Sequence, residues 1–233
     1  MPSQLQAIVL DARHPAVLAA FWGALLGREV VAEPEGAWLP GSDTQVGLRF
    51  VTARAEIVRP RYEYLHLHLT STTPEAQQGS VDKVLGLGGS HLDVGQLPDE
   101  GHIVLADPEG NALCVIEPGN NYLAGTGHLG EVACDGRREV GVFWSEALGW
   151  PLVWDQDDET AIQSPAGGTK LAWGGARDEP KNARSPQRFD LTTADVAAEV
   201  DRLVALGATR LGDRAGVVEL ADPDDTEFSL REG

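Results

Sequence analysis

Cysteine and basic residues are scarce in this chain of 233 residues, and each shortage argues against a class of protein. The two cysteines, Cys114 and Cys134, form no C-x-x-C pair, so a disulfide scaffold is not expected and a reduced, cytoplasmic setting fits best. Lys and Arg total 18 against 36 Asp and Glu, which gives a formal net charge of −18. No basic run offsets this charge locally, so nucleic acid is disfavoured as a partner.

Long hydrophobic runs are also missing. No stretch of 18 apolar residues occurs, and therefore no membrane span is expected. The first residues lack a basic segment, and Asp11 and Arg13 interrupt their short apolar run, which favours a strand over a signal peptide. Apolar residues nevertheless make up 42% of the chain, enough for a substantial core.

The sequence contains an internal repeat. AAFWGALLGREVV (19–31) reappears as GVFWSEALGWPLV (141–153), and LADPEGNALCVIE (105–117) reappears as LADPDDTEFSLRE (220–232). Between these segments, 68–89 corresponds to 190–208. We therefore interpret the chain as two homologous units, 1–119 and 126–233, joined by the Gly- and Asn-containing connector PGNNYLAGTG (118–127).

Both units show the same order of predicted elements. The first unit begins with a predicted strand, 4–10. A helix follows that starts at Pro15 and ends at Gly27, and three short strands come after it, 28–33, 36–39 and 45–51. A second such set contains a helix whose start is marked by Thr72 and Glu75, and its predicted strands are 62–70, 90–96, 101–106 and 111–117. The second unit repeats this order, with Thr192 and Asp195 at the start of its second helix. The predicted order is βαβββ twice in each unit.

Three local features accompany this order: an FW-containing helix that ends in LG, a histidine on the fifth strand and the D-P-E-G-N turn. In this combination the chain resembles the vicinal oxygen chelate superfamily. That superfamily includes glyoxalase I, extradiol dioxygenases and bleomycin-resistance proteins, and the resemblance is closest to its glyoxalase-like domain branch. The resemblance covers nearly the whole chain. It implies an α+β fold of two tandem glyoxalase-like domains, each with two βαβββ modules that form a curved mixed β-sheet cup. Trp22 and Trp144 repeat at equivalent helix positions, so we expect them to pack in the core or between domains.

The resemblance also implies a divalent metal held inside the cup. Its ligand positions in the first unit fall on Gln4, seven residues before Asp11, and on His66 and Glu117. Such a set of amide, imidazole and carboxylate suits Zn, Ni, Mn, Fe or Co, and no organic cofactor is implied. In the second unit the same positions are His128, Arg188 and Glu232. Because a guanidinium cannot bind a metal, we expect a degenerate second site in which Arg188 pairs with Glu232.

Strand alternation gives an independent indication of which side chains face the cup. Leucines alternate with His66 and His68 along the fifth strand, which turns both histidines to the face opposite the leucines. On the last strand we assign Glu117 to the histidine side and Cys114 to the apolar face. His68, His102 and Trp38 are further candidates for contacting a small molecule; the alternatives are solvated histidines and a structurally buried tryptophan.

The resemblance implies a metal-dependent lyase, isomerase or dioxygenase that acts on a small molecule in the first unit, with a degenerate second unit. The alternative is a non-catalytic protein that binds a small molecule or an antibiotic, as bleomycin-resistance proteins do; the acidic charge suits a cationic ligand. In a third alternative neither cup is functional and the chain acts through contacts with a protein partner. A homodimer and a monomer with pseudo-dimeric domains are both compatible with the sequence.

Overall fold

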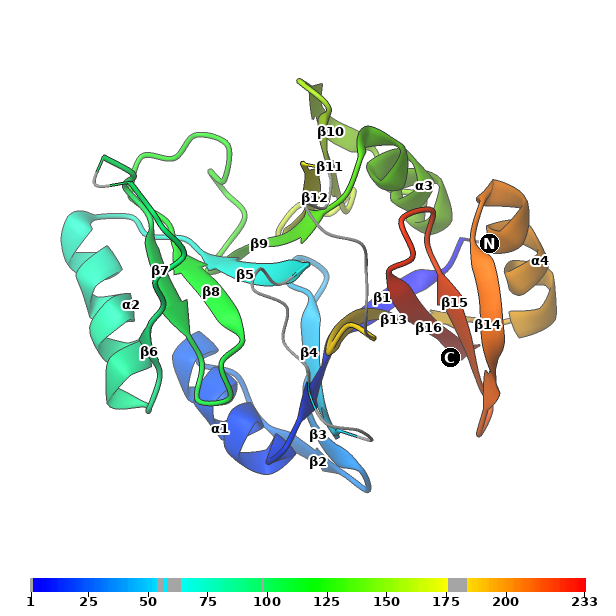
Figure 1. The fold of residues 1–233 in the computed structure, drawn as a ribbon, viewed down its shortest axis with the longest axis horizontal. Coiled ribbons are helices and arrows are strands. Elements are labelled where there is room, and N and C mark those ends of the chain that lie inside the picture. Colours follow the sequence, from blue (N-terminus) through cyan, green and yellow to red (C-terminus); the bar gives the residue numbers. More distant parts are fainter. Residues whose placement is uncertain (1, 54–56, 58–63, 98, 176–183) are drawn as a thin grey trace.

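The strands and helices of the chain form four successive βαβββ modules (Figure 1). A computed structural model describes residues 2–53, 57, 64–97, 99–175 and 184–233. Positions 62 and 63 of the predicted fifth strand lie outside these residues. The first module contains β1 (Gln4–Ala12), α1 (Pro15–Leu26), β2 (Val31–Glu33), β3 (Gly36–Leu39) and β4 (Gly47–Thr52). The second contains β5 (Leu65–Leu69), α2 (Pro74–Gly86), β6 (Ser90–His91), β7 (Ile103–Ala106) and β8 (Ala112–Val115).

The second half of the chain repeats the two modules. The third module contains β9 (Leu129–Asp135), α3 (Arg138–Leu148), β10 (Leu152–Gln156), β11 (Glu159–Gln163) and β12 (Lys170–Gly174). The fourth contains β13 (Gln187–Thr193), α4 (Val196–Leu206), β14 (Thr209–Arg214), β15 (Val217–Ala221) and β16 (Glu227–Glu232). The predicted α+β organisation of two tandem units, each with two βαβββ modules, is therefore confirmed.

Each of the two eight-stranded sheets takes one module from each half of the chain. Sheet 1 joins the first and fourth modules in the order β14-β15-β16-β13-β1-β4-β3-β2. Sheet 2 joins the second and third modules in the order β10-β11-β12-β9-β5-β8-β7-β6. In both sheets the two modules meet through an antiparallel pair, β1 with β13 and β5 with β9.

This pairing differs from the expected one, in which the two modules of one half share a cup. The reason lies in the similarity of the modules. Each module exposes an unpaired edge of its first strand, and the edge of any other module can satisfy the same backbone groups. Local sequence patterns predict the modules but not which edges meet.

The helices hold the two modules of each half together. α1 contacts α2, and α3 contacts α4 (Figure 1). The Trp22 indole N–H donates to the Asp107 carboxylate at 3.1 Å, and Trp144 donates to Asp222 at the same distance. Both tryptophans are fully buried, which confirms their predicted packing role.

Two predicted helix starts are displaced. Thr73, rather than Thr72, caps α2 by accepting a hydrogen bond from the Ala76 N–H at 3.1 Å. Asp195 caps α4 in the same way, accepting from Ala198 at 3.1 Å, and Thr192 lies within β13. A capping side chain must directly precede the first helical residue to reach these N–H groups. The three-residue spacing of the predicted pairs does not by itself identify that residue.

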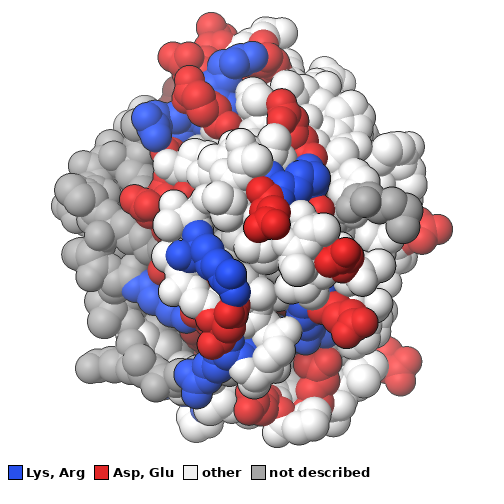
Figure 2. All heavy atoms as spheres, turned by 90° about the vertical axis from the view of Figure 1, so that its right-hand side faces the viewer, with Lys and Arg blue, Asp and Glu red and all other residues white. Residues whose placement is uncertain are grey.

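Charged side chains of both signs are scattered among uncharged ones on the face drawn in Figure 2. On the face that carries α4 and β14, Lys and Arg are interspersed with Asp and Glu and leave no continuous basic patch (Figure 2). Among the described residues, no helix is sufficiently long and apolar to span a membrane.

Candidate functional site

His66 and His68 lie on β5, near the middle of sheet 2. Leu65, Leu67 and Leu69 alternate with them and are almost fully buried in the main core. The alternation that the sequence predicted is therefore observed, and both imidazoles point to the face opposite the core. Their ring centroids are 4.7 Å apart.

Cys114 joins the two histidines. β8 runs parallel to β5 with Cys114 beside His68, and the donor atoms of His66, His68 and Cys114 all lie within 4.8 Å of one another. The predicted faces of β8 were wrong, because Leu113 and Val115 pack in the core and Cys114 faces the histidines. The signal was present in the sequence: the apolar residues of β8 flank Cys114 as the leucines of β5 flank its histidines.

Glu131 on β9 pairs with His68 from the neighbouring strand. His68 Nδ1 lies 2.6 Å from a Glu131 carboxylate oxygen, and both side chains are largely buried. Burial works against the charged form of His68, but hydrogen bonds to Cys114 and Glu131 outweigh it and raise the pKa of His68 to about 9. Burial also disfavours the Glu131 carboxylate, yet the contact with His68 lowers its pKa below the ordinary value. The two groups therefore form an ion pair near neutral pH.

His66 has the opposite electrostatics. Burial, followed by the positive charge of His68, lowers the pKa of His66 to about 3. Its ring is therefore neutral near pH 7 and keeps a nitrogen lone pair. One buried histidine is charged and paired, and its neighbour is uncharged.

His66, His68 and Glu131 line a cavity of about 410 Å³, and aromatic side chains complete its wall. Tyr122, from the connector between the halves, lies with its ring centroid 5.8 Å from that of Trp154 in a nearly perpendicular arrangement. Lys170 lies 4.0 Å above the Tyr122 ring and donates a hydrogen bond to the Tyr122 carbonyl. Burial raises the pKa of Tyr122, and the Glu131 charge adds to this effect, so its hydroxyl stays protonated. No sequence pattern indicated that the connector contributes to a site.

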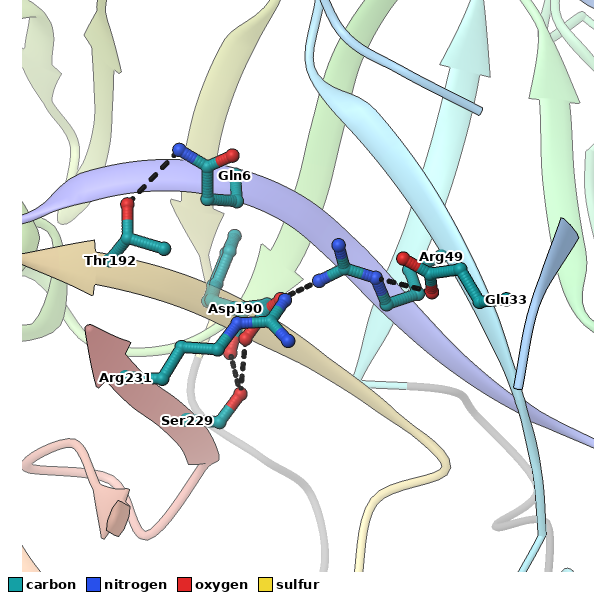
Figure 3. Close-up of polar contacts among 8 residues, drawn as sticks. Gln6, Glu33, Arg49, Asp190, Thr192, Ser229 and Arg231 are labelled. Atoms are coloured by element: carbon teal, nitrogen blue, oxygen red, sulfur yellow. Dashed lines mark hydrogen bonds and ion pairs between the residues drawn. The ribbon is translucent and has the colours of Figure 1, made fainter. Parts of the chain in front are cut away.

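At the equivalent place in sheet 1, the described residues form an ion-pair network. The Arg49 guanidinium donates to Asp190 and, at 3.0 Å, to Glu33 (Figure 3). Arg231 donates to the same Asp190 carboxylate, and the Ser229 hydroxyl donates to it at 2.9 Å. A buried carboxylate is thus surrounded by two guanidinium groups.

Strand register shows that the two sheets differ at equivalent positions. Asp190 lies beside Ser229 in sheet 1, as His68 lies beside Cys114 in sheet 2. Opposite them on the neighbouring strand are Ala7 in sheet 1 and Glu131 in sheet 2. Sheet 2 therefore presents nitrogen and sulfur donors where sheet 1 presents a carboxylate already neutralised by arginine.

The structure does not bring the predicted ligands Gln4, His66 and Glu117 together. Gln4 lies on β1 in sheet 1, whereas His66 lies in sheet 2. Glu117 follows the end of β8 and accepts a hydrogen bond from the Asn120 side chain at 3.2 Å. The different pairing of the modules explains the separation of Gln4, and the corrected faces of β8 explain the position of Glu117.

The predicted ligand-contacting residues are also dispersed. Trp38 lies on β3 in sheet 1, where Arg49 lies 5.2 Å from its ring centroid. His102 precedes β7, and its ring lies 3.8 Å from the Glu100 carboxylate. Of the three candidates, His68 lines the cavity in sheet 2.

The residues of the predicted degenerate site are separated as well. His128 is exposed just before β9, and Glu232 is exposed at the end of β16. Arg188 donates to Asp11 at 2.7 Å, so its acidic partner differs from the expected Glu232.

Comparison with known proteins relates most of the chain to one family. A family model described as "Glyoxalase-like domain" matches residues 7–116 and again residues 131–231. No match is found among curated proteins.

Solved structures share the fold over nearly the full length of the chain. Glyoxalase I from Zea mays superposes with a TM-score of 0.65 at 14% identity, covering 99% of this chain and 92% of that one. A single-residue mutant of that enzyme gives a TM-score of 0.66 at 16% identity, with the same coverage. A Bacillus subtilis protein described as a "putative dioxygenase" superposes with a TM-score of 0.61 at 15% identity, covering 98% of this chain and 84% of that one.

Proposed function

Because the chain belongs to the glyoxalase-like domain family, we propose that it is a divalent-metal-dependent enzyme that acts on a small molecule at sheet 2. One observation carries this proposal: His66, His68 and Cys114 present donor atoms within 4.8 Å of one another beside a cavity of about 410 Å³. We propose that sheet 1 is the degenerate counterpart, since Arg49 and Arg231 already neutralise its central carboxylate.

The donor set fits a metal ion of intermediate softness. Two imidazoles and a thiolate suit Zn²⁺ best among the candidate metals Zn, Ni, Mn, Fe and Co, and three protein ligands leave a further position for substrate. Glu131 holds His68 through Nδ1, and a metal would bind at Nε2 by displacing the proton that the charged ring carries there. The neutral ring of His66 supplies the second nitrogen.

A metal bound by these residues would supply Lewis-acid polarisation of substrate oxygens. The remaining roles belong to the chain. Tyr122 keeps its proton and donates it to Glu131, so its hydroxyl oxygen can accept a hydrogen bond from a substrate hydroxyl, while Glu131 fixes the orientation of His68. Trp154 provides an aromatic wall that orients a flat molecule. Lyase and isomerase reactions fit Zn²⁺ in this site, whereas a dioxygenase reaction would require a redox-active ion such as Fe or Mn.

Metal analysis tests the proposal directly. Protein purified without chelators is expected to contain close to one equivalent of metal, and His66→Ala and Cys114→Ser are expected to lose most of it. Substitution with Co²⁺ should give a thiolate-to-cobalt charge-transfer absorption that Cys114→Ser abolishes. His91→Ala, at an exposed histidine on β6, serves as the control and should keep the metal. Less than about 0.1 equivalent in the unaltered protein would overturn the metalloenzyme proposal.

The aromatic wall of the cavity favours a second candidate function, binding of a small molecule without chemistry. Tyr122 and Trp154 meet at a ring distance of 5.8 Å and could hold a ligand by contact alone. In that case the affinity for the ligand should stay the same after chelation of metal, and the ligand should be recovered unchanged. For the enzyme, chelation should weaken binding and abolish turnover.

We also propose that a monomer is sufficient for function. Each sheet completes its central strand pair within one chain, so a second copy is not needed to form the cavity. The proposed partners are therefore small molecules. The proposed units are 1–119 and 126–233, with the connector supplying Tyr122 to the site.

A further inference from the structure

A second cavity lies where the two halves of the chain meet. It has a volume of about 390 Å³ and lies between the start of β1, β3, the β3–β4 connection and the β11–β12 turn. Gln4 and Trp38, which the sequence singled out and the proposed function does not use, both line it. Trp150, which follows α3, lines it from the second half of the chain.

Hydrogen bonds between the two turns hold this junction cavity in shape. The Thr169 N–H donates to the Thr44 carbonyl at 2.9 Å. The Gln45 side chain crosses to the other half, donating to the Thr126 carbonyl at 2.7 Å and accepting from the Leu129 N–H at 3.2 Å. At Gly168 a Cβ would lie 1.7 Å from the Thr44 carbonyl oxygen, so only glycine permits this approach. A fixed cavity can bind a ligand without a large ordering cost.

The lining chemistry favours an uncharged ligand. Among the described residues that line the junction cavity, Asp43 alone carries an ionisable side chain. The other polar side chains are amides and hydroxyls, from Gln4, Gln6, Ser42, Thr44, Gln45, Ser164 and Thr169. A charged ligand would lose water here with few opposite charges to compensate, whereas amides and hydroxyls exchange hydrogen bonds readily with other hydroxyl groups.

Two indoles complete the lining. Trp38 and Trp150 offer flat apolar surfaces, and the Trp38 Nε1–H is buried without a hydrogen-bond acceptor among the described residues. The Gln6 amide nitrogen is directed to Thr192 at 3.0 Å, which leaves its carbonyl oxygen as an acceptor (Figure 3). The indole faces, rather than the buried Nε1–H, are therefore the surfaces that Trp38 and Trp150 can offer to a ligand.

We propose that the junction cavity binds a small, uncharged, hydroxyl-rich molecule of monosaccharide size. The tryptophan faces contact its C–H surfaces, and the amide and hydroxyl side chains pair with its hydroxyl groups. The volume falls within the usual range for small-molecule sites. This site is independent of the His66 cavity and needs no metal.

Titration with sugars, followed through the six tryptophan indole N–H signals by NMR, tests the proposal. The probes are D-glucose, D-ribose and myo-inositol, with D-glucuronate and D-glucosamine as charged comparisons. At least one uncharged probe is expected to shift the Trp38 and Trp150 signals saturably while the Trp154 signal stays in place. The charged comparisons should bind at least about 10-fold more weakly.

A matched pair of variants separates binding at the cavity from general effects. Gln4→Ala removes an exposed amide at the cavity and should weaken binding at least about 5-fold. Gln78→Ala removes an exposed amide on α2 and should leave binding unchanged. Absence of a saturable shift with every uncharged probe up to about 100 mM, equal binding of charged probes, or full affinity in Gln4→Ala would each overturn the proposal.

Discussion

Glu131 has two different partners in the His66 cavity. One of its carboxylate oxygens lies 2.6 Å from the His68 ring, and, in addition to burial, its charge and its hydrogen bond with the Tyr122 hydroxyl raise the pKa of Tyr122. Glu131 is only 5% exposed, so its carboxylate needs these partners. The charged state of the cavity therefore depends on one side chain of β9. Alternation along β9 could have indicated that Glu131 faces away from the core, but only strand pairing placed it against His68.

The pH dependence of stability follows from this ion pair. The folded-state pKa of His68, about 9, lies above its ordinary value of 6.5. The resulting stabilisation is complete below pH 6.5 and is lost as the pH rises through 9. The lowered pKa of Glu131 contributes in the opposite direction: its stabilisation is present above the ordinary carboxyl value and is lost in acid.

Glu131→Gln should therefore lower the free energy of unfolding near neutral pH by about 3 kcal/mol, because it leaves His68 buried without its counter-charge. The difference from the unaltered protein should shrink as the pH rises above the His68 pKa of about 9. Urea denaturation in the presence of a chelator measures both effects. Asp213→Asn, which breaks an exposed pair with Arg210, should cost less than about 1 kcal/mol. A loss in Glu131→Gln that is equal at all pH values would contradict the assignment.

At the scale of elements, the turns that follow β7 and β15 are as important as the strands. Asp107 accepts hydrogen bonds from Trp22, from the Asn111 backbone and side chain, and from the Glu109 N–H. The equivalent Asp222 accepts from Trp144. The D-P motif that revealed the repeat is therefore a link between a turn and the helix of the preceding module.

Asp107→Ala is expected to destabilise the chain by about 3 kcal/mol, because it leaves several buried donors without an acceptor. Thermal and urea unfolding measure the loss, and Asp222→Ala should give a similar value. Asp93→Ala, at an exposed acid that accepts from the Gly95 N–H, serves as the control and should change stability by less than about 0.5 kcal/mol. Equal effects of Asp107→Ala and Asp93→Ala would show that the link contributes nothing.

At the scale of the whole molecule, the described sheets and helices connect different parts of the chain. The sheets pair modules from opposite halves, whereas the helix contacts and the tryptophan–aspartate links lie within each half. Separation of the halves would therefore expose the central edge strands β1, β5, β9 and β13 at once.

Expression of residues 1–124 alone should give a fragment that does not fold as a monomer, and co-expression with residues 125–233 should restore a one-to-one complex with the secondary structure of the intact chain. The physical reason is the loss of both central strand pairs, which no contact within one half replaces in this arrangement. Circular dichroism and light scattering measure the outcome. A cooperatively folding monomeric fragment would show that the two modules of one half can pair with each other.

The sequence by itself determined the four modules, because the duplication, the helix-ending glycines and the alternation on β5 are local patterns that depend on neighbouring residues. It also placed His66 and His68 on the inner face. The tertiary structure alone decided which modules share a sheet, and with it that Gln4 lies apart from His66 while Cys114, Glu131 and Tyr122 join the histidines. The physical reason is that backbone hydrogen bonds at a strand edge do not distinguish one module from another, so partners are selected by packing between residues far apart in the chain.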